Sequence, residues 1–86
     1  MPEVSRFFGV VIRMYFDEHL PPHFHANYGG DEAQIGIEPI QILNGQLPTR
    51  VISMVFEWAA IHQRELMENW NRMRTDNAPK KIDPLR

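Results

Sequence analysis

The first half of the chain alternates between apolar and polar positions, whereas the second half repeats its apolar positions every three or four residues. Alternation is typical of a half-buried β-strand, and the longer period is typical of an amphipathic helix. The segment RFFGVVIRMYF, residues 6–16, is therefore expected to form one strand. The apolar positions on one face of that strand are Phe8, Val10, Ile12, Met14 and Phe16.

Further strands are expected at HFHANY, residues 23–28, and at EAQIGI, residues 32–37. IQIL, residues 40–43, either extends the sheet edge or forms a short fourth strand. Gly29 and Gly30 supply a turn between the second and third strands. Because short turns join neighbouring strands, we predict an antiparallel meander of three or four strands.

A single long helix is expected from residue 48 to residue 74, beginning at Pro48 or Thr49 and ended before Pro79. Its apolar stripe consists of Ile52, Val55, Ala59, Leu66, Trp70 and Met73. Such a helix is roughly 40 Å long, whereas a strand of five or six residues spans only about 17–20 Å. The helix is therefore expected to extend well beyond the sheet.

A second apolar flank of this helix carries Met54, Trp58 and Ile61. A homodimer or a partner protein would cover that flank. Alternatively, the tail folds back and places Ile82 and Leu85 against it, although the last ten residues have the composition of a loosely ordered terminus. The sequence leaves both arrangements open. The overall prediction is one α+β domain over residues 1–86, with strands within residues 6–43, a helix over residues 48–74 and an extended tail over residues 75–86.

Composition narrows the class of protein. The 86 residues include no cysteine and carry a formal net charge of −2. No run of about 18 apolar residues is present to span a membrane, and the first residues lack the charged start and apolar run of a secretion signal. We therefore expect a small, soluble, cytoplasmic protein. The charge argues against a general nucleic-acid coat protein, although a local basic patch can still bind RNA.

Three of the four histidines lie within seven positions, in the segment HLPPHFHANYGG. If HFHANY is a strand, His23 and His25 share one face, and Phe24 and Tyr28 share the other. With Phe24 and Tyr28 packed on the helix, the two histidines are expected to project into solvent beside Arg13.

Two imidazoles and a guanidinium suffice for metal-independent cleavage of RNA. Of His23 and His25, one can withdraw a proton while the other donates one, and Arg13 can stabilise charge on the phosphate. Further candidate contacts to a substrate or partner are Tyr15, Tyr28, Lys80 and Lys81. A purely structural role in a polar loop is the alternative for the histidines.

The same histidines are compatible with a metal site. His-x-His on a strand directs two nitrogens toward one point, and His19, Asp17 or Glu18 could supply a third ligand. A shift of one residue in the strand register would turn the pair toward the helix, where His62 lies. That shift would form a buried site of three histidines. Over both arrangements, the candidate ligands for Zn²⁺ or another divalent transition metal are His19, His23, His25 and His62.

Three stretches, SRFFGVVIRMYFDEHLPPHFHANYGG, EWAAIHQRELMENW and KKIDPL, together resemble the bacterial domain-of-unknown-function 4160 family over nearly the whole chain. The family's motif positions correspond here to Arg13, His23, Phe24, His25, Tyr28, His62 and Glu65. The resemblance implies a small stand-alone protein whose gene lies beside one of the domain-of-unknown-function 2442 family. Such a gene pair is similar to a toxin–antitoxin operon, and the resemblance implies no particular activity.

The leading functional hypothesis is a toxin-like ribonuclease or phosphodiesterase that needs no cofactor. The first alternative is a non-enzymatic binding module for the protein encoded by the neighbouring gene. The second is a hydrolase with a histidine-ligated metal ion.

Overall fold

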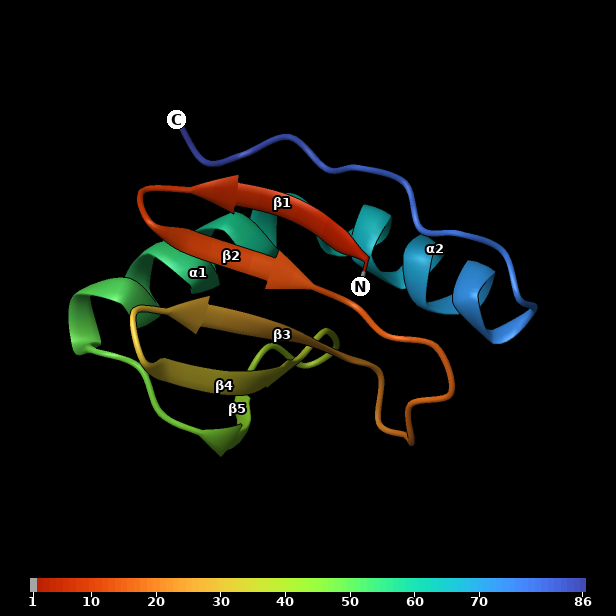
Figure 1. The fold of residues 1–86 in the computed structure, drawn as a ribbon, viewed down its shortest axis with the longest axis horizontal. Coiled ribbons are helices and arrows are strands. Elements are labelled where there is room, and N and C mark those ends of the chain that lie inside the picture. The colour runs from red at the N-terminus through yellow and green to blue at the C-terminus, as the bar shows by residue number, and fades with distance from the viewer. Residues whose placement is uncertain (1) are drawn as a thin grey trace.

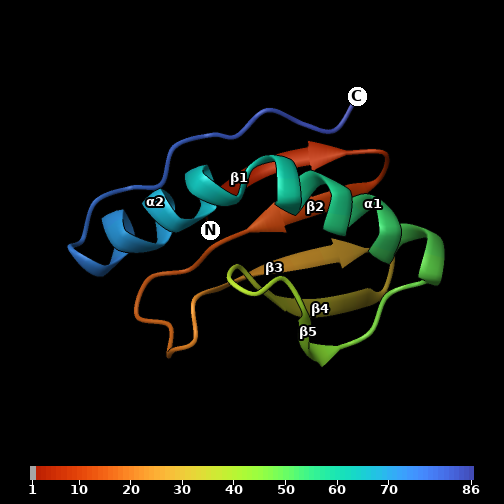
Figure 2. The same cartoon turned by 180° about the vertical axis from the view of Figure 1, so that it is seen from behind.

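Each strand of the sheet pairs with the strand that follows it in the sequence, and the two helices lie together on one face (Figures 1 and 2). The structure is a computed structural model that describes residues 2–86. The strands are β1 (Glu3–Phe7), β2 (Val10–Arg13), β3 (His23–Tyr28), β4 (Asp31–Gly36) and β5 (Ile42–Gly45), and the helices are α1 (Thr49–Ile61) and α2 (Gln63–Arg74). The α+β class and the antiparallel meander are confirmed, but the sheet has five strands rather than three or four.

The additional strand arises because the segment predicted as one strand over residues 6–16 is a hairpin. Phe8 and Gly9 join β1 to β2 with positive φ angles of 48° and 84°. Two consecutive residues of positive φ suit the mirror-image turns that connect twisted antiparallel strands. Phe8 is consequently 62% exposed rather than part of the core, and Phe16, in the loop after β2, is also exposed. The prediction failed here because the apolar pattern runs through the turn without a polar break.

The predicted strand at HFHANY is confirmed residue for residue, and so is its alternation. Phe24 and Ala26 are fully buried, and the Phe24 ring meets the Trp58 ring of α1 edge-on at 5.7 Å between centroids. Because successive side chains of a strand point to opposite faces, His23 and His25 lie on the face away from α1. The strand therefore separates an apolar layer beneath the helices from a polar face.

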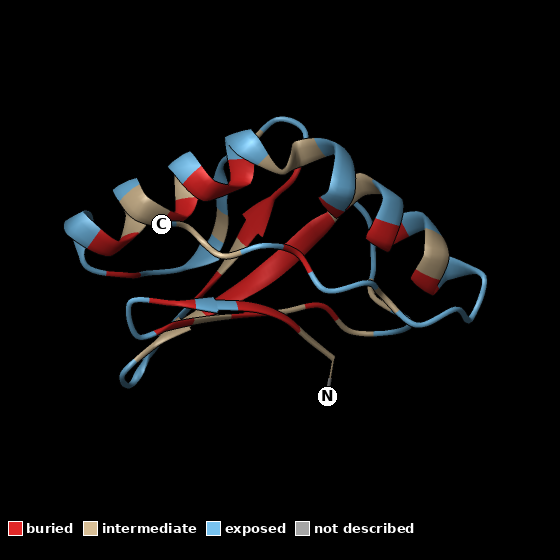
Figure 3. Ribbon diagram, turned by 90° about the horizontal axis from the view of Figure 1, so that it is seen from above, coloured by how far each residue is buried: buried red, intermediate tan, exposed pale blue. Residues whose placement is uncertain are grey.

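The helical segment is broken at His62, so the single helix predicted over residues 48–74 is wrong in that detail. His62 has φ −110° and ψ 23°, outside helical geometry, and ends α1 immediately before α2 begins. Beside the break, the Gln63 side-chain amide donates to the Ile37 carbonyl at 2.7 Å. The change of direction brings the buried side of both helices toward the sheet (Figure 3). The buried helix positions are Val51, Val55, Trp58, Ala59, Leu66, Asn69, Trp70 and Met73.

The tail folds back along β1 and α1, as one of the two predicted arrangements requires (Figure 1). The Ile82 amide donates to the Val4 carbonyl at 2.8 Å, beside the free edge of β1. The Trp58 indole donates to the Asp83 carbonyl at 2.8 Å, and both Trp58 and Ile82 are buried. The loose order predicted for the last residues is therefore wrong, because backbone groups of the tail are bound to the sheet and to α1.

The tail covers only part of the predicted apolar flank. Trp58 is fully buried and Leu85 is half-buried, whereas Ile61 is 64% exposed. Asn69 of α2 fixes the tail at Lys80, just before Ile82. Its side-chain oxygen accepts from the Lys80 amide at 2.8 Å, and its side-chain nitrogen donates to the Lys80 carbonyl at 2.9 Å. Among residues 2–86, neither helix has the length and apolar character needed to cross a membrane.

Candidate metal centre

Two histidines at the start of β3 form the centre of the candidate site. The rings of His23 and His25 lie 5.3 Å apart between centroids, on the shared face that the strand pattern predicts. They do not project into solvent, however: their exposed fractions are 6% and 7%. The prediction that the two histidines form an open, solvent-facing patch is therefore wrong, whereas the prediction that they lie together on one face is confirmed.

Neighbouring aromatic rings bury the two histidines. The Tyr15 ring meets the His25 ring edge-on at 4.6 Å, and the Trp70 ring of α2 lies 5.4 Å from the ring of His23. Tyr15 belongs to the loop of residues 14–22 that connects β2 to β3. The loop covers His25 on the sheet face away from α1, and Trp70 of α2 covers His23 at the start of β3.

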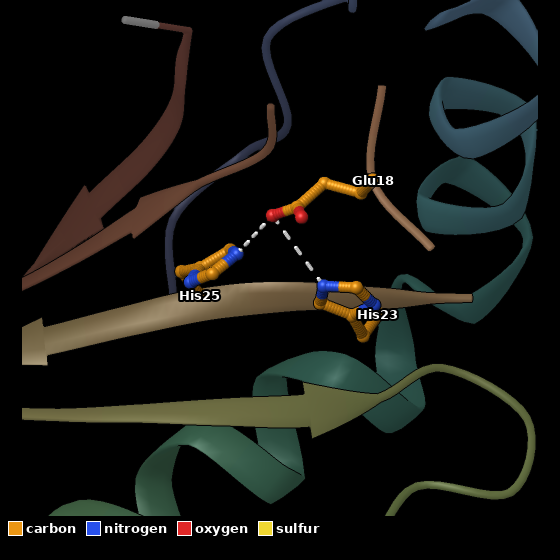
Figure 4. A group of neighbouring side chains, drawn as sticks. All are labelled: Glu18, His23 and His25. Atoms are coloured by element: carbon orange, nitrogen blue, oxygen red, sulfur yellow. Dashed lines mark hydrogen bonds and ion pairs between the residues drawn. The ribbon is translucent and has the colours of Figure 1, made fainter. Parts of the chain in front are cut away.

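The same loop brings a carboxylate to the histidines (Figure 4). Glu18 Oε1 lies 2.5 Å from His25 Nε2 and 3.5 Å from His23 Nε2. Potential ligand atoms of these three residues all lie within 4.8 Å of one another, and they form the only such group among residues 2–86. Glu18 is one of the three residues that the sequence offers as a third ligand.

The remaining ring nitrogens are held by acceptors. His23 Nδ1 lies 2.9 Å from the Pro21 carbonyl oxygen, and His25 Nδ1 lies 2.9 Å from Glu32 Oε2. A carbonyl oxygen only accepts hydrogen bonds, so the proton of His23 belongs on Nδ1, whereas His25 has a carboxylate acceptor at each ring nitrogen. In a neutral His23 ring, Nε2 then presents a lone pair toward Glu18, and His25 Nε2 would do so when Nδ1 donates to Glu32. Metal-binding histidines in proteins are oriented in this way, with the second nitrogen donating to a carboxylate or a backbone carbonyl.

Of the two Nε2 atoms that face Glu18, only that of His25 is paired, at 2.5 Å from Glu18 Oε1. His23 Nε2 is buried and has no hydrogen-bond partner among the described residues, because its 3.5 Å approach to Glu18 lacks hydrogen-bond geometry. His25 has a carboxylate oxygen at each ring nitrogen, and a neutral imidazole can donate to only one of them. A cation between the three residues would satisfy all three atoms.

The spacing is compatible with an ion. Two ligands at zinc distances of about 2.0–2.1 Å lie roughly 3.3 Å apart in a tetrahedral site. The distance from His23 Nε2 to Glu18 Oε1 is 3.5 Å, close to that value. The His25 contact of 2.5 Å is shorter, so the Glu18 side chain must swing away by about an ångström to admit the ion. That movement is small for a half-buried side chain on a loop.

Glu32 forms the outer part of the site. Besides the contact to His25, its other oxygen accepts from the Asn27 amide at 3.2 Å, and Asn27 accepts from the Arg13 guanidinium at 3.1 Å. The hydrogen bond with His25 lowers the pKa of the Glu32 carboxyl, partial burial opposes that effect, and the Asn27 bond adds to the lowering. Glu32 is thereby kept as the anion that holds His25 in place.

Arg13 lies beside His25, as predicted, because the two residues are direct partners in the pairing of β2 with β3. Its guanidinium is turned toward Asn27. Arg13 is therefore on the β2 side of His25, whereas Gln34 is the partner of His25 on the β4 side. Whether Arg13 contacts a phosphate stays a prediction.

The other predicted contact residues are dispersed. Tyr15 packs on His25, but Tyr28 lies at the far end of β3, where its hydroxyl accepts from Arg50 at 3.3 Å. Lys80 and Lys81 belong to the tail, and the Lys81 ammonium donates to the Glu3 carbonyl at 2.7 Å. The structure brings only Tyr15 to the histidine pair.

The four-histidine ligand set does not assemble. His19 is exposed in the loop, and His62 lies at the helix junction with its ring 5.6 Å from Trp58 and Nδ1 2.6 Å from a Glu65 oxygen. Neither joins the group formed by Glu18 and the histidines of β3. The sequence contains no signal that selects Glu18 over His19, because the choice depends on the path of an irregular loop.

Two clefts of about 420 Å³ flank that loop. The first lies toward α2 and includes Tyr15, Trp70 and Arg74. The second lies toward β4 and β5 and includes Glu18 and His23, two of the three potential ligands. A ligand bound in the second cleft would therefore lie against Glu18 and His23.

Fold and site define a small α+β protein with a buried two-histidine, one-carboxylate cluster on the sheet face away from α1. The family model described as "Domain of unknown function (DUF4160)" matches residues 9–71, and the chain belongs to this family. The resemblance seen in the sequence is thereby confirmed, while the neighbouring gene stays a prediction. Searches of curated proteins and of solved structures give no significant match.

Proposed function

We propose that the chain binds one divalent transition metal ion through Glu18, His23 and His25 and acts as a metal-dependent hydrolase. One observation carries the proposal: His23 Nε2 is buried without a hydrogen bond and faces the same carboxylate oxygen as His25 Nε2. A buried polar atom without a partner costs free energy, and coordination of an ion would remove that cost.

The donor set determines the chemistry that is available. Two imidazoles and one carboxylate suit zinc and other late first-row metals, and three protein ligands leave at least one position for water or substrate. A bound ion of this kind acidifies its water and polarises a carbonyl or phosphoryl oxygen. The protein's own contribution is to hold His23 through Pro21 and His25 through Glu32 in the orientation that this chemistry requires.

Metal-free cleavage of RNA is less well supported by the geometry. Both histidines are buried, and His25 lies between the carboxylates of Glu18 and Glu32. Without a cation, those carboxylates repel a phosphate group. A toxin-like role, a protein partner and RNA as a substrate stay predictions, and the structure adds no contact that favours the binding-module alternative.

Metal titration tests the proposal directly. Untagged protein, stripped with a chelator and dialysed, is titrated with Zn²⁺ and analysed by native mass spectrometry and calorimetry. We expect one ion per chain and a rise in the unfolding temperature, because the ion binds the folded state. His23→Ala and His25→Ala should each weaken Zn²⁺ binding by more than about 100-fold, since outer partners of a metal ligand alone contribute 10- to 100-fold.

His19→Ala and His62→Ala serve as matched controls. Each removes a histidine outside the cluster, so Zn²⁺ binding should match that of the unmodified chain. Circular dichroism of the metal-free variants checks that each one folds. Stoichiometric binding that survives the double change of His23 and His25 to Ala would exclude this site.

A further inference from the structure

The cleft toward β4 and β5 has a composition that limits what the metal centre can act on. It measures about 420 Å³ and contains Glu18 and His23 from the metal centre. Glu18 and His23 both line this cleft, whereas Glu18 is the only one of the three residues that lines the cleft beside α2. The group that reacts must therefore enter between the loop and the β4–β5 edge.

Among the described residues, no lysine or arginine lines this cleft. Arg13 lies on the opposite side of His25 and is bonded to Asn27. Arg74 lines the other cleft, beside α2. A phosphodiester would thus find no lysine or arginine here to offset its charge besides the ion, which one carboxylate ligand already partly neutralises. A neutral reacting group avoids that electrostatic cost.

The remaining walls consist of three apolar side chains, one amide and the exposed imidazole of His19. Leu20 and Pro21 line the loop side, and Leu43 lines the opposite side, next to the half-buried Gln34. Leu20 is among the most exposed large apolar side chains of the structure. An exposed Leu20 and a half-buried Leu43 on the two sides of a polar centre suit an apolar group of a ligand, and a glutamine amide can donate to a carbonyl oxygen.

We infer that this cleft is an acyl-binding site and that the substrate is a neutral carboxylic ester or amide with a small apolar acyl group. This inference rests on the proposed metal-dependent hydrolase. In the reaction, a water oxygen bonds to the acyl carbon, and the bond from that carbon to the alcohol oxygen or amine nitrogen breaks. The leaving atom takes the electron pair of the broken bond and a proton from the water, so that the products are an acid and an alcohol or amine.

Within this site, Leu20 and Leu43 hold the acyl group, and Gln34 is a positioning residue for the carbonyl. Gln34 is placed for this role because it is the strand partner of His25 and lines the same cleft as His23. The arrangement predicts a preference for a longer acyl group that reaches Leu43.

The test uses the zinc-loaded chain of residues 1–86 and three chromogenic probes: p-nitrophenyl acetate, p-nitrophenyl butyrate and bis(p-nitrophenyl) phosphate. We expect metal-dependent hydrolysis of both esters, with kcat/KM at least about tenfold higher for the butyrate, because its acyl chain has two more methylenes and one methylene in an apolar pocket contributes about tenfold or more. The phosphodiester should react more slowly than either ester. Leu43→Ala should remove the preference for butyrate, while Ile42→Ala, one position away on β5 and outside the cleft, should retain it.

The outcomes separate the two proposals because Zn²⁺ binding is measured on the same samples. If the ion binds and the phosphodiester is hydrolysed faster than the esters, the substrate class is overturned and the metal site stands. If the ion binds and Leu43→Ala leaves the chain-length preference unchanged, the acyl site is overturned. If no ion binds, the metal-dependent function itself fails.

Discussion

His23 and His25 differ in the group that fixes each ring. A backbone carbonyl in the loop, from Pro21, holds His23, whereas a side-chain carboxylate on β4, from Glu32, holds His25. Because the partner of His25 is a side chain, Glu32 can be substituted without disturbing the backbone. Asn27 and Arg13 extend it into a chain of hydrogen bonds that ends on β2. At this scale, the site is a set of side chains whose orientation depends on partners two strands apart.

Glu32→Gln tests the outer part of the site. The substitution keeps the shape of the side chain but removes the negative charge that orients and polarises His25. We expect Zn²⁺ affinity to fall by about 10- to 100-fold, the usual effect of losing an outer carboxylate of a metal ligand. Competition with a chromophoric chelator measures the affinity. Glu38→Gln, an exposed glutamate outside the cluster, is the control and should leave the affinity unchanged.

At the scale of single elements, residues with turn geometry determine where strands and helices end, and the hydrophobic pattern does not reveal these ends. The β1–β2 hairpin requires positive φ at Phe8 and Gly9, and β5 packs so closely on β4 that a Cβ at Gly45 would lie 2.2 Å from the Glu32 carbonyl oxygen. The two helices likewise meet at a single non-helical residue, His62. Such features depend on one or two residues and leave no periodic signal.

Gly9→Ala should destabilise the fold by about 1–2 kcal/mol, because an L-residue in the left-handed region incurs roughly that cost. The added Cβ would also lie 3.2 Å from a carbon of the Tyr28 ring. Urea unfolding measures the loss. Gly30→Ala is the matched control: nothing lies within 4 Å of its Cβ position, so its stability should change little.

Phe8→Asn should act in the opposite direction. Asparagine tolerates positive φ better than phenylalanine, and Asn-Gly is the preferred pair in two-residue hairpins of this kind. Because Phe8 is mostly exposed, little packing is lost. We expect a gain of about 0.5–1 kcal/mol in the same unfolding experiment. A loss of stability would show that the Phe8 side chain contributes packing that its exposure does not reveal.

At the scale of the whole molecule, the tail completes the fold by binding β1 and α1 together. Its backbone satisfies the Val4 carbonyl at the free edge of the sheet and the Trp58 indole of the first helix. An open strand edge invites association with other chains, so this cover also protects the molecule. The residual exposed part of the apolar flank, Ile61, is available to the homodimer predicted from the sequence, which stays a prediction.

Ile82→Ala tests the role of the tail. Truncating a buried isoleucine should lower the free energy of unfolding by about 2–4 kcal/mol, and it should raise self-association if the edge of β1 and Trp58 become accessible. Chemical unfolding monitored by tryptophan fluorescence, together with sedimentation velocity, measures both effects. Ile61→Ala, at an exposed position, should change stability by less than about 0.5 kcal/mol.

The sequence by itself determined the strand at residues 23–28, the shared face of His23 and His25, and the placement of Phe24 toward the helices. These properties follow from the two-residue period of a strand, which is a local geometric rule. Only the tertiary structure decided that the histidines are buried, that Glu18 rather than His19 meets them, and that the tail covers Trp58. Those outcomes depend on irregular segments, whose paths are set by packing against residues distant in the sequence and not by any repeating pattern.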